Sequence, residues 1–135
     1  MAETAAVTLL RPVRVLVAGD DAEIVGHLRD ELLRTGFHAM STSRLSRVTE
    51  LAAVERVNVV ILEVSGGLSA AASTAAAVEA LPQPIRVLLA GARIRGATGL
   101  GYDTIDPHGS IEELAAAVHR AYRGGPARAE RSSGP

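Results

Sequence analysis

Three acidic side chains stand where the sequence predicts the ends of two buried strands. Asp20 and Asp21 directly follow the apolar run VRVLVAG (13–19), and Glu63 stands near the end of the run NVVILEV (58–64). Carboxylates from neighbouring strand ends can hold a hard cation such as Mg²⁺, or raise one another's pKa. The alternative is that each acid is solvated or caps the next helix, and the position of Asp21 favours helix capping. For Asp20 with Glu63 both interpretations stay open.

The composition removes several other chemistries. All 14 basic residues of the 135-residue chain are arginine, and the chain has neither lysine nor cysteine. A Schiff base, a Walker lysine, a thiol nucleophile, a zinc–thiolate site and a disulfide are therefore excluded. The net charge of −1 gives no field that would attract nucleic acid or an anionic membrane. No apolar run approaches ~20 residues and no export signal is recognisable, so we expect a cytoplasmic protein.

Familiar catalytic motifs are missing at the predicted strand ends. The turn AGDDAEIVG (18–26) carries carboxylates where a dinucleotide-binding loop needs glycines. The string SGG (65–67) lacks the full Gly-x-Ser-x-Gly pattern of a serine hydrolase and its Asp and His partners. No two histidines have the spacing of a metal-ligand pair on a helix. We expect ordinary surface or half-buried side chains at His27, His38, His108 and His119. The sequence thus predicts a protein that is not an enzyme.

Short apolar runs predict the sheet that positions the acids. The runs at 13–19, 58–64 and 85–91 are dense in β-branched residues and leucine, as in parallel strands buried on both faces. FHAM (37–40) and YDTID (102–106) are weaker strand candidates. In an open parallel sheet the functional site lies at the carboxyl ends of the strands, where the acids stand.

Apolar side chains recur at helical spacing between these runs. One stripe extends over 24–33, a second over 45–52, and residues 68–81 are an alanine-rich third helix. Ser110 and Glu113 form a capping box that begins the last helix. The side chains expected to face inward from the first and last helices are Ile24, Val25, Leu28, Leu32, Leu33, Ile111, Leu114, Ala115, Val118 and Tyr122.

The alternation of strands and helices predicts an α/β fold, a doubly wound five-stranded parallel sheet of the flavodoxin-like type. The segment 92–101 has three glycines, so the fourth helix is expected to be short or missing. Residues 1–11 are expected to be a leader, and the Gly/Pro/Ser/Arg-rich end 125–135 a flexible tail or linker stub. The folded domain is expected to cover 12–124.

The order and spacing of these strings resemble the receiver domain of bacterial two-component response regulators. Its opening strand, acidic turn and first helix are similar to VRVLVAGDD and LRDELLRTGF, and its third strand to NVVILE. The last strand and helix of receivers attached to helix-turn-helix output domains look like GYDTID and SIEELAAAVHRAYRGG. The resemblance covers nearly all of the predicted domain and implies the receiver fold.

The chain departs from this family at the acids that carry its phosphorylation chemistry. The family's acid pair after the first strand aligns with Gly19 and Asp20, so one acid is lost and a degenerate pocket with Asp21 remains. The phosphoacceptor aspartate becomes Glu63. Its extra methylene displaces the carboxylate by on the order of 1 Å, which is enough to slow a positioned reaction about 100-fold.

The other family positions lack the groups that would sense or neutralise a phosphoryl group. The Thr or Ser at the end of the fourth strand aligns with Leu89, and the lysine aligns with Ile105 or Asp106. The aromatic switch residue is kept as Tyr102 if Ile105 is the match. Phosphoryl transfer needs a cation on the developing charge, so the resemblance implies a degenerate, or pseudo-receiver, type.

A degenerate receiver implies signal transduction by protein–protein interaction, independent of aspartyl phosphorylation and of any cofactor. The expected partner is another signalling protein or an output domain, with a homodimer as a second arrangement and with no nucleic acid or membrane. Under one hypothesis the longer Glu63 mimics phosphoaspartate. Under the other it is an acid tolerated in an unused site.

Two further alternatives stay open. A small-molecule or nucleotide-sensing α/β domain would use the same strand-end crevice, lined by Arg93, Arg95 and His108. A receiver that is still active would bind Mg²⁺ weakly through Asp20 and Glu63.

Overall fold

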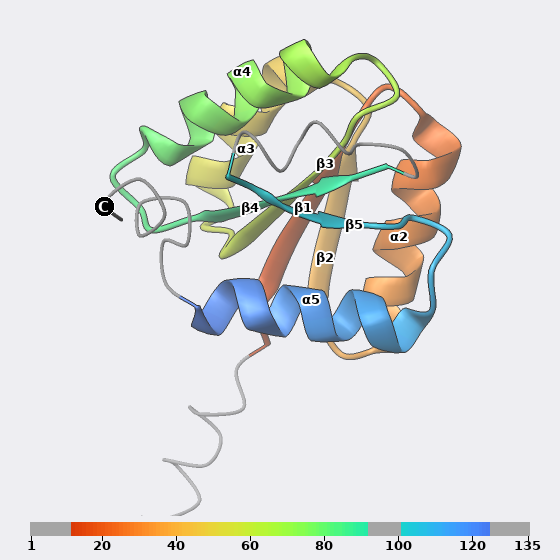
Figure 1. Ribbon diagram of the computed structural model, residues 1–135. Coiled ribbons are helices and arrows are strands. Elements are labelled where there is room, and N and C mark those ends of the chain that lie inside the picture. Colours follow the sequence, from red (N-terminus) through yellow and green to blue (C-terminus); the bar gives the residue numbers. More distant parts are fainter. Residues whose placement is uncertain (1–11, 92–100, 125–135) are drawn as a thin grey trace, which may run out of the picture.

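The computed structural model describes residues 12–91 and 101–124, in which five strands form one sheet with helices on both faces (Figure 1). The strands are β1 (Arg14–Ala18), β2 (His38–Thr42), β3 (Val59–Glu63), β4 (Arg86–Ala90) and β5 (Asp103–Ile105). All neighbouring strands are parallel, in the order β2-β1-β3-β4-β5. The doubly wound five-stranded parallel sheet predicted from the sequence is therefore confirmed.

The apolar runs form strands because their side chains are buried on both faces. Every residue of β3 is buried, and β1 and β4 are buried after their first residue. The two weaker candidates are strands as well, at His38–Thr42 and Asp103–Ile105, on the two edges of the sheet. Edge position explains their weaker pattern, since an edge strand needs less apolar surface than a central one.

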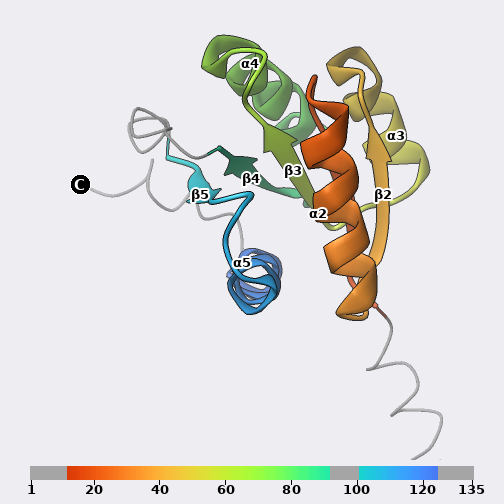
Figure 2. The same cartoon turned by 90° about the vertical axis from the view of Figure 1, so that its right-hand side faces the viewer.

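The helices divide the core into two layers. They are α2 (Ala22–Arg34), α3 (Val48–Val54), α4 (Leu68–Glu79) and α5 (Ile111–Arg123), with a short 3-10 turn at Leu45–Arg47. The apolar sides of α2 and α5 pack on one face of the sheet, and those of α3 and α4 pack on the other (Figure 2). The predicted capping box is confirmed at α5, where Ser110 Oγ accepts from Glu113 N at 3.1 Å and Ser110 N donates to Glu113 Oε1 at 3.1 Å.

Two residues that the sequence predicts to face inward are exposed, so these two predictions are wrong. Leu33 is 50% exposed and Tyr122 is 46% exposed. Leu33 directly follows the fully buried Leu32, so the helix turns its side chain about 100° away from the buried one. Tyr122 lies one turn beyond the fully buried Val118, in the last turn of α5. On α5 the buried face includes Ala117 instead. The alanine-rich helix ends at Glu79, two residues earlier than predicted.

Some sequence predictions concern residues outside the described ranges. The short or missing fourth helix falls on 92–101, of which only Gly101 is described, and both Arg93 and Arg95 lie in that gap. The leader at 1–11 and the tail at 125–135 lie outside as well. None of the described helices has the length and hydropathy needed to cross a membrane.

Candidate functional site

Glu63 stands in a row of residues across the carboxyl ends of the strands. Glu63 is in register with Ala90 of β4, and Ala90 is in register with Ile105 of β5. Paired residues of parallel strands point to the same face, so the row continues from Glu63 with two apolar side chains. On the other side, Gly19 follows β1 next to Glu63. None of these neighbours carries a charge.

The Glu63 carboxylate is enclosed and hydrogen-bonded to two loops. Its side chain is 3% exposed, although it is ionisable. Oε1 accepts from Asp21 N at 3.2 Å and from Ser65 Oγ at 2.8 Å, and Oε2 accepts from Ser65 N at 2.7 Å. A buried carboxylate is tolerated when such donors replace its water. Glu63 thus ties the start of α2 to the loop between β3 and α4.

Gly19 provides the space in which this carboxylate lies. A Cβ atom at Gly19 would come 2.6 Å from Glu63 Cβ and 2.7 Å from Glu63 Oε1. Carbon atoms in contact normally stay 3.5–4.0 Å apart, so no larger residue fits without a shift of the strand ends. The glycine at position 19 and the glutamate at position 63, which both differ from the receiver pattern that the sequence resembles, therefore depend on each other: the small residue leaves the space that the long side chain fills.

The remaining acids of the pocket have separate roles. Asp21 is the N-cap of α2, with Oδ1 accepting from Glu23 N at 3.1 Å and from Ile24 N at 3.2 Å, so the capping interpretation is confirmed. Asp20 is exposed, and its carboxylate lies over Gly66, where a Cβ would overlap Oδ2. No group of three or more potential metal ligands occurs among the described residues.

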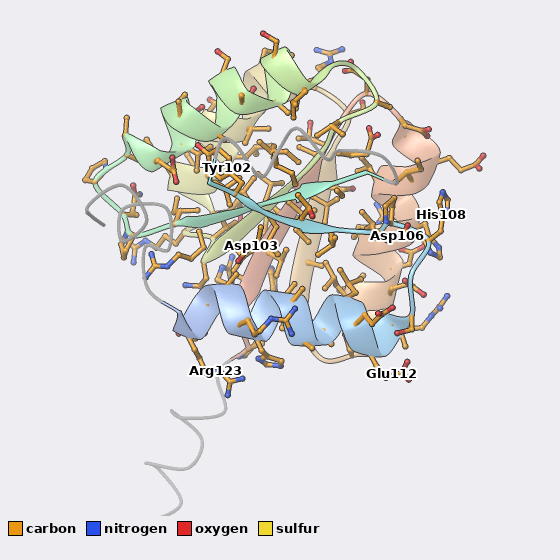
Figure 3. The ribbon with its side chains drawn as sticks, in the orientation of Figure 1. Tyr102, Asp103, Asp106, His108, Glu112 and Arg123 are labelled. Atoms are coloured by element: carbon orange, nitrogen blue, oxygen red, sulfur yellow. The ribbon has the colours of Figure 1, made fainter. Side chains whose placement is uncertain are left out.

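The positions that the sequence resemblance predicts for the family's hydroxyl and lysine are apolar or solvent-exposed. Leu89 is fully buried and in register with Leu62, on the face covered by α3 and α4 and opposite to the Glu63 side chain. Ile105 is half-buried on the α5 face. Asp106 is exposed and accepts from His108 N at 2.9 Å, and both residues stand in the loop before α5 (Figure 3).

Tyr102 lies inside the protein on the α4 side of the sheet (Figure 3). Its side chain is buried, and its hydroxyl donates to Glu79 Oε1 at 2.7 Å. Glu79 is the last residue of α4, so this bond ties the start of β5 to the end of that helix.

The sequence did not predict the role of Ser65. The string SGG (65–67) was weighed only as a hydrolase motif, whereas Ser65 supplies two of the three donors to Glu63. The available signal was a hydroxyl residue two positions after an acid, because short polar side chains at that spacing bond to nearby backbone in turns. Gly67 follows with φ 121°, a conformation that favours glycine, and is the N-cap of α4.

Known proteins of similar sequence give no assignment, since neither a protein-family model nor a curated protein matches the chain. Solved structures of similar fold include the receiver domain of NarL from Mycobacterium tuberculosis, with 23% identity, a TM-score of 0.68, and coverage of 84% of this chain and 98% of that one. An orphan response regulator of H. pylori has 23% identity and a TM-score of 0.66, covering 82% and 97%. An atypical orphan response regulator, described with a phosphorylation-independent regulatory mechanism, has 22% identity and a TM-score of 0.67, covering 85% and 99%.

Identities of 22–23% establish the fold and leave the activity to be argued from the residues. Together with the strand order and the two helical layers, they show that the chain has the fold of response-regulator receiver domains.

Proposed function

We propose that this chain is an atypical receiver domain that acts in signal transduction by protein–protein interaction and independently of aspartyl phosphorylation. One observation carries the proposal: the acid at the phosphoacceptor position, Glu63, is buried and engaged by three hydrogen bonds. A nucleophile must instead be free to approach phosphorus in line with the leaving group.

The surroundings of Glu63 support the same conclusion. Its row neighbours Gly19, Ala90 and Ile105 supply neither a carboxylate for Mg²⁺ nor a cation for the developing phosphoryl charge. Because the chain has no lysine, no second ammonium group can replace the family's lysine, and the planar guanidinium of an arginine is not an equivalent substitute. The described residues also offer no group of three potential ligands for Mg²⁺. Glu63, one of the two ligands that a still-active receiver would use here, is instead engaged by protein donors.

Glu63 acts, in this proposal, as a permanent tie between two loops. The donors that it binds come from the loops after β1 and after β3. Tyr102, at the aromatic switch position, is held inside by Glu79. These contacts favour one constant conformation over a switch, and they account for the retained acid without requiring that it mimic phosphoaspartate.

The proposed partner is another signalling protein or an output domain in the cytoplasm. The atypical orphan regulator of similar fold supports the phosphorylation-independent part of the proposal, because that protein is described with a phosphorylation-independent regulatory mechanism. The small-molecule alternative has less support from the described residues: His108 is exposed, and a hollow of about 410 Å³ between β5 and α5 includes Asp106 but neither Asp20 nor Glu63.

Incubation with acetyl phosphate and Mg²⁺ tests the proposal. We expect the intact mass of this chain to stay unchanged, while an ordinary receiver domain with its aspartate and lysine, in the same tube, gains one phosphoryl group. Glu63→Asp serves as the matched variant and is also expected to stay unmodified, since Gly19 and Ile105 still lack the acid and the cation. A stable gain of one phosphoryl group on the unaltered chain contradicts the proposal.

A further inference from the structure

The largest exposed apolar side chains of the described residues stand at the ends of three helices. Leu33 is near the end of α2, Val54 ends α3 and is 69% exposed, and Tyr122 is near the end of α5. Single exposed apolar residues need no explanation, whereas exposed apolar residues that line one hollow are candidates for an interaction site.

Val54 and Tyr122 line the same groove, which has a volume of about 1190 Å³. Its other lining residues include Phe37 and His119, whose rings lie 4.9 Å apart. The segments just before β1, β2 and β3 also contribute to its lining, so this amino-end groove lies at the opposite end of the sheet from Glu63.

The rim of the amino-end groove carries a surplus of positive charge. Arg14 is neutralised by Glu55, through an ion pair at 3.5 Å and a bond from Arg14 Nε to Glu55 O at 2.8 Å. Within the described part of the chain, Arg56 and Arg123 have no ion pair, and both line the groove.

Arg56 has a backbone conformation that is unfavourable for any residue other than glycine. Its φ is 53°, the left-handed conformation in which a helix commonly ends at glycine. Arg56 N donates to Ala53 O and Val57 N donates to Ala52 O, the two hydrogen bonds of that glycine-type helix end. Local stability alone would favour glycine here, so the arginine points to a role outside the fold.

We propose that the amino-end groove docks an acidic segment of a partner protein, with one or two large apolar side chains seated against Val54 and Tyr122. The exposed apolar side chains in the groove would contact the large apolar residues of the segment. Arg56 and Arg123, which have no ion pair among the described residues, would attract the acidic residues on either side of them. This surface is separate from the strand-end site, so its test does not depend on whether Glu63 accepts a phosphoryl group.

The experiment uses the full chain and a designed peptide of about 12 residues in which leucine and phenylalanine alternate with aspartate and glutamate. Backbone NMR shifts and calorimetry should show binding, with the largest shifts at Val54, Arg56 and Tyr122. A peptide with the same apolar residues and lysine in place of the acids should bind at least about tenfold more weakly. A peptide with serine in place of the apolar residues should also lose binding.

Three variants make the test specific. Arg123→Glu should weaken binding of the acidic peptide about tenfold, whereas Arg44→Glu, an equal charge change at the exposed carboxyl side of the sheet, should change it less than twofold. Arg56→Gly should weaken binding by several-fold and at the same time raise the urea midpoint of unfolding. That opposite pair of effects would not follow from a merely structural role.

Other outcomes overturn the proposal. Absence of binding by the acidic peptide, equal binding of the lysine peptide, or shifts confined to another face each contradict it. Dimerisation of the chain that Val54→Asp abolishes, seen by light scattering, would assign the groove to a second copy. Tighter binding of a single-stranded oligonucleotide than of the acidic peptide, lost in Arg123→Glu, would assign it to nucleic acid.

Discussion

The two ends of the sheet use their charged side chains in opposite ways. At the carboxyl end, Glu63 is buried and each of its oxygens accepts a hydrogen bond. At the amino end, Arg56 and Arg123 line an open groove and have no ion pair within the described ranges, beside an exposed Val54. Among the described residues, the acid at the end where receivers do their chemistry is enclosed, whereas Arg56 and Arg123, in the groove at the other end, are open to solvent.

From this contrast we expect the carboxyl end to contribute more to the free energy of unfolding, and the amino end to be the more available for binding a partner. A buried acid with satisfied hydrogen bonds stabilises one geometry and leaves little capacity for a new ligand. Exposed arginines and apolar side chains contribute little to folding, and they keep their interactions available for a partner. The three predictions below compare how much the two ends contribute to the free energy of unfolding, beginning with the largest effect.

Removal of the Glu63 carboxylate should have the largest effect on stability. Glu63→Ala empties the space of a buried side chain and removes the acceptor of three part-buried hydrogen bonds, from Asp21 N, Ser65 N and Ser65 Oγ, so the free energy of unfolding should fall by about 2–4 kcal/mol. Glu63→Gln keeps one acceptor oxygen and should cost less than Glu63→Ala. Urea unfolding followed by circular dichroism measures both, and an unchanged midpoint in Glu63→Ala would refute the assignment of stability to the carboxyl end.

A methyl group at Gly19 should have the next largest effect. Gly19→Ala places a carbon against Glu63 Cβ and Oε1, so the free energy of unfolding should fall by about 1–3 kcal/mol. Gly66→Ala is the matched control at the neighbouring loop. Its new methyl would meet the end of the exposed Asp20 side chain, which can turn toward water, so we expect a loss below about 1 kcal/mol. Equal losses in the two variants would show that the space at Gly19 has no special importance.

Truncation at the amino-end groove should have the smallest effect. Val54→Ser removes an exposed apolar side chain, so the free energy of unfolding should change by less than about 0.5 kcal/mol. Val48→Ser, at the other end of the same helix, removes a fully buried one and should cost about 2–4 kcal/mol. Comparable losses in thermal or urea unfolding would mean that Val54 belongs to the core.

Local patterns predicted most of the fold and part of the site. The strands at 13–19, 58–64 and 85–91 were recognisable because burial on both faces requires nearly continuous apolar residues. Asp21 and Ser110 were recognisable as caps because helix capping depends on a few adjacent residues. The exposure of Leu33 and Tyr122 was not recognisable, since an apolar residue at the border of the stripe or in the last turn fits the periodicity whether or not another element covers it.

By itself, the sequence determined which chemistries are excluded and which elements form. The absence of lysine and cysteine is a property of composition, and the strand runs and the capping box depend on neighbours along the chain. Only the tertiary structure decided that Gly19 makes room for Glu63, that Ser65 satisfies it, and that the ends of α3 and α5 share one groove. These features join segments far apart in the chain, so they depend on strand register and helix placement, which no local pattern encodes.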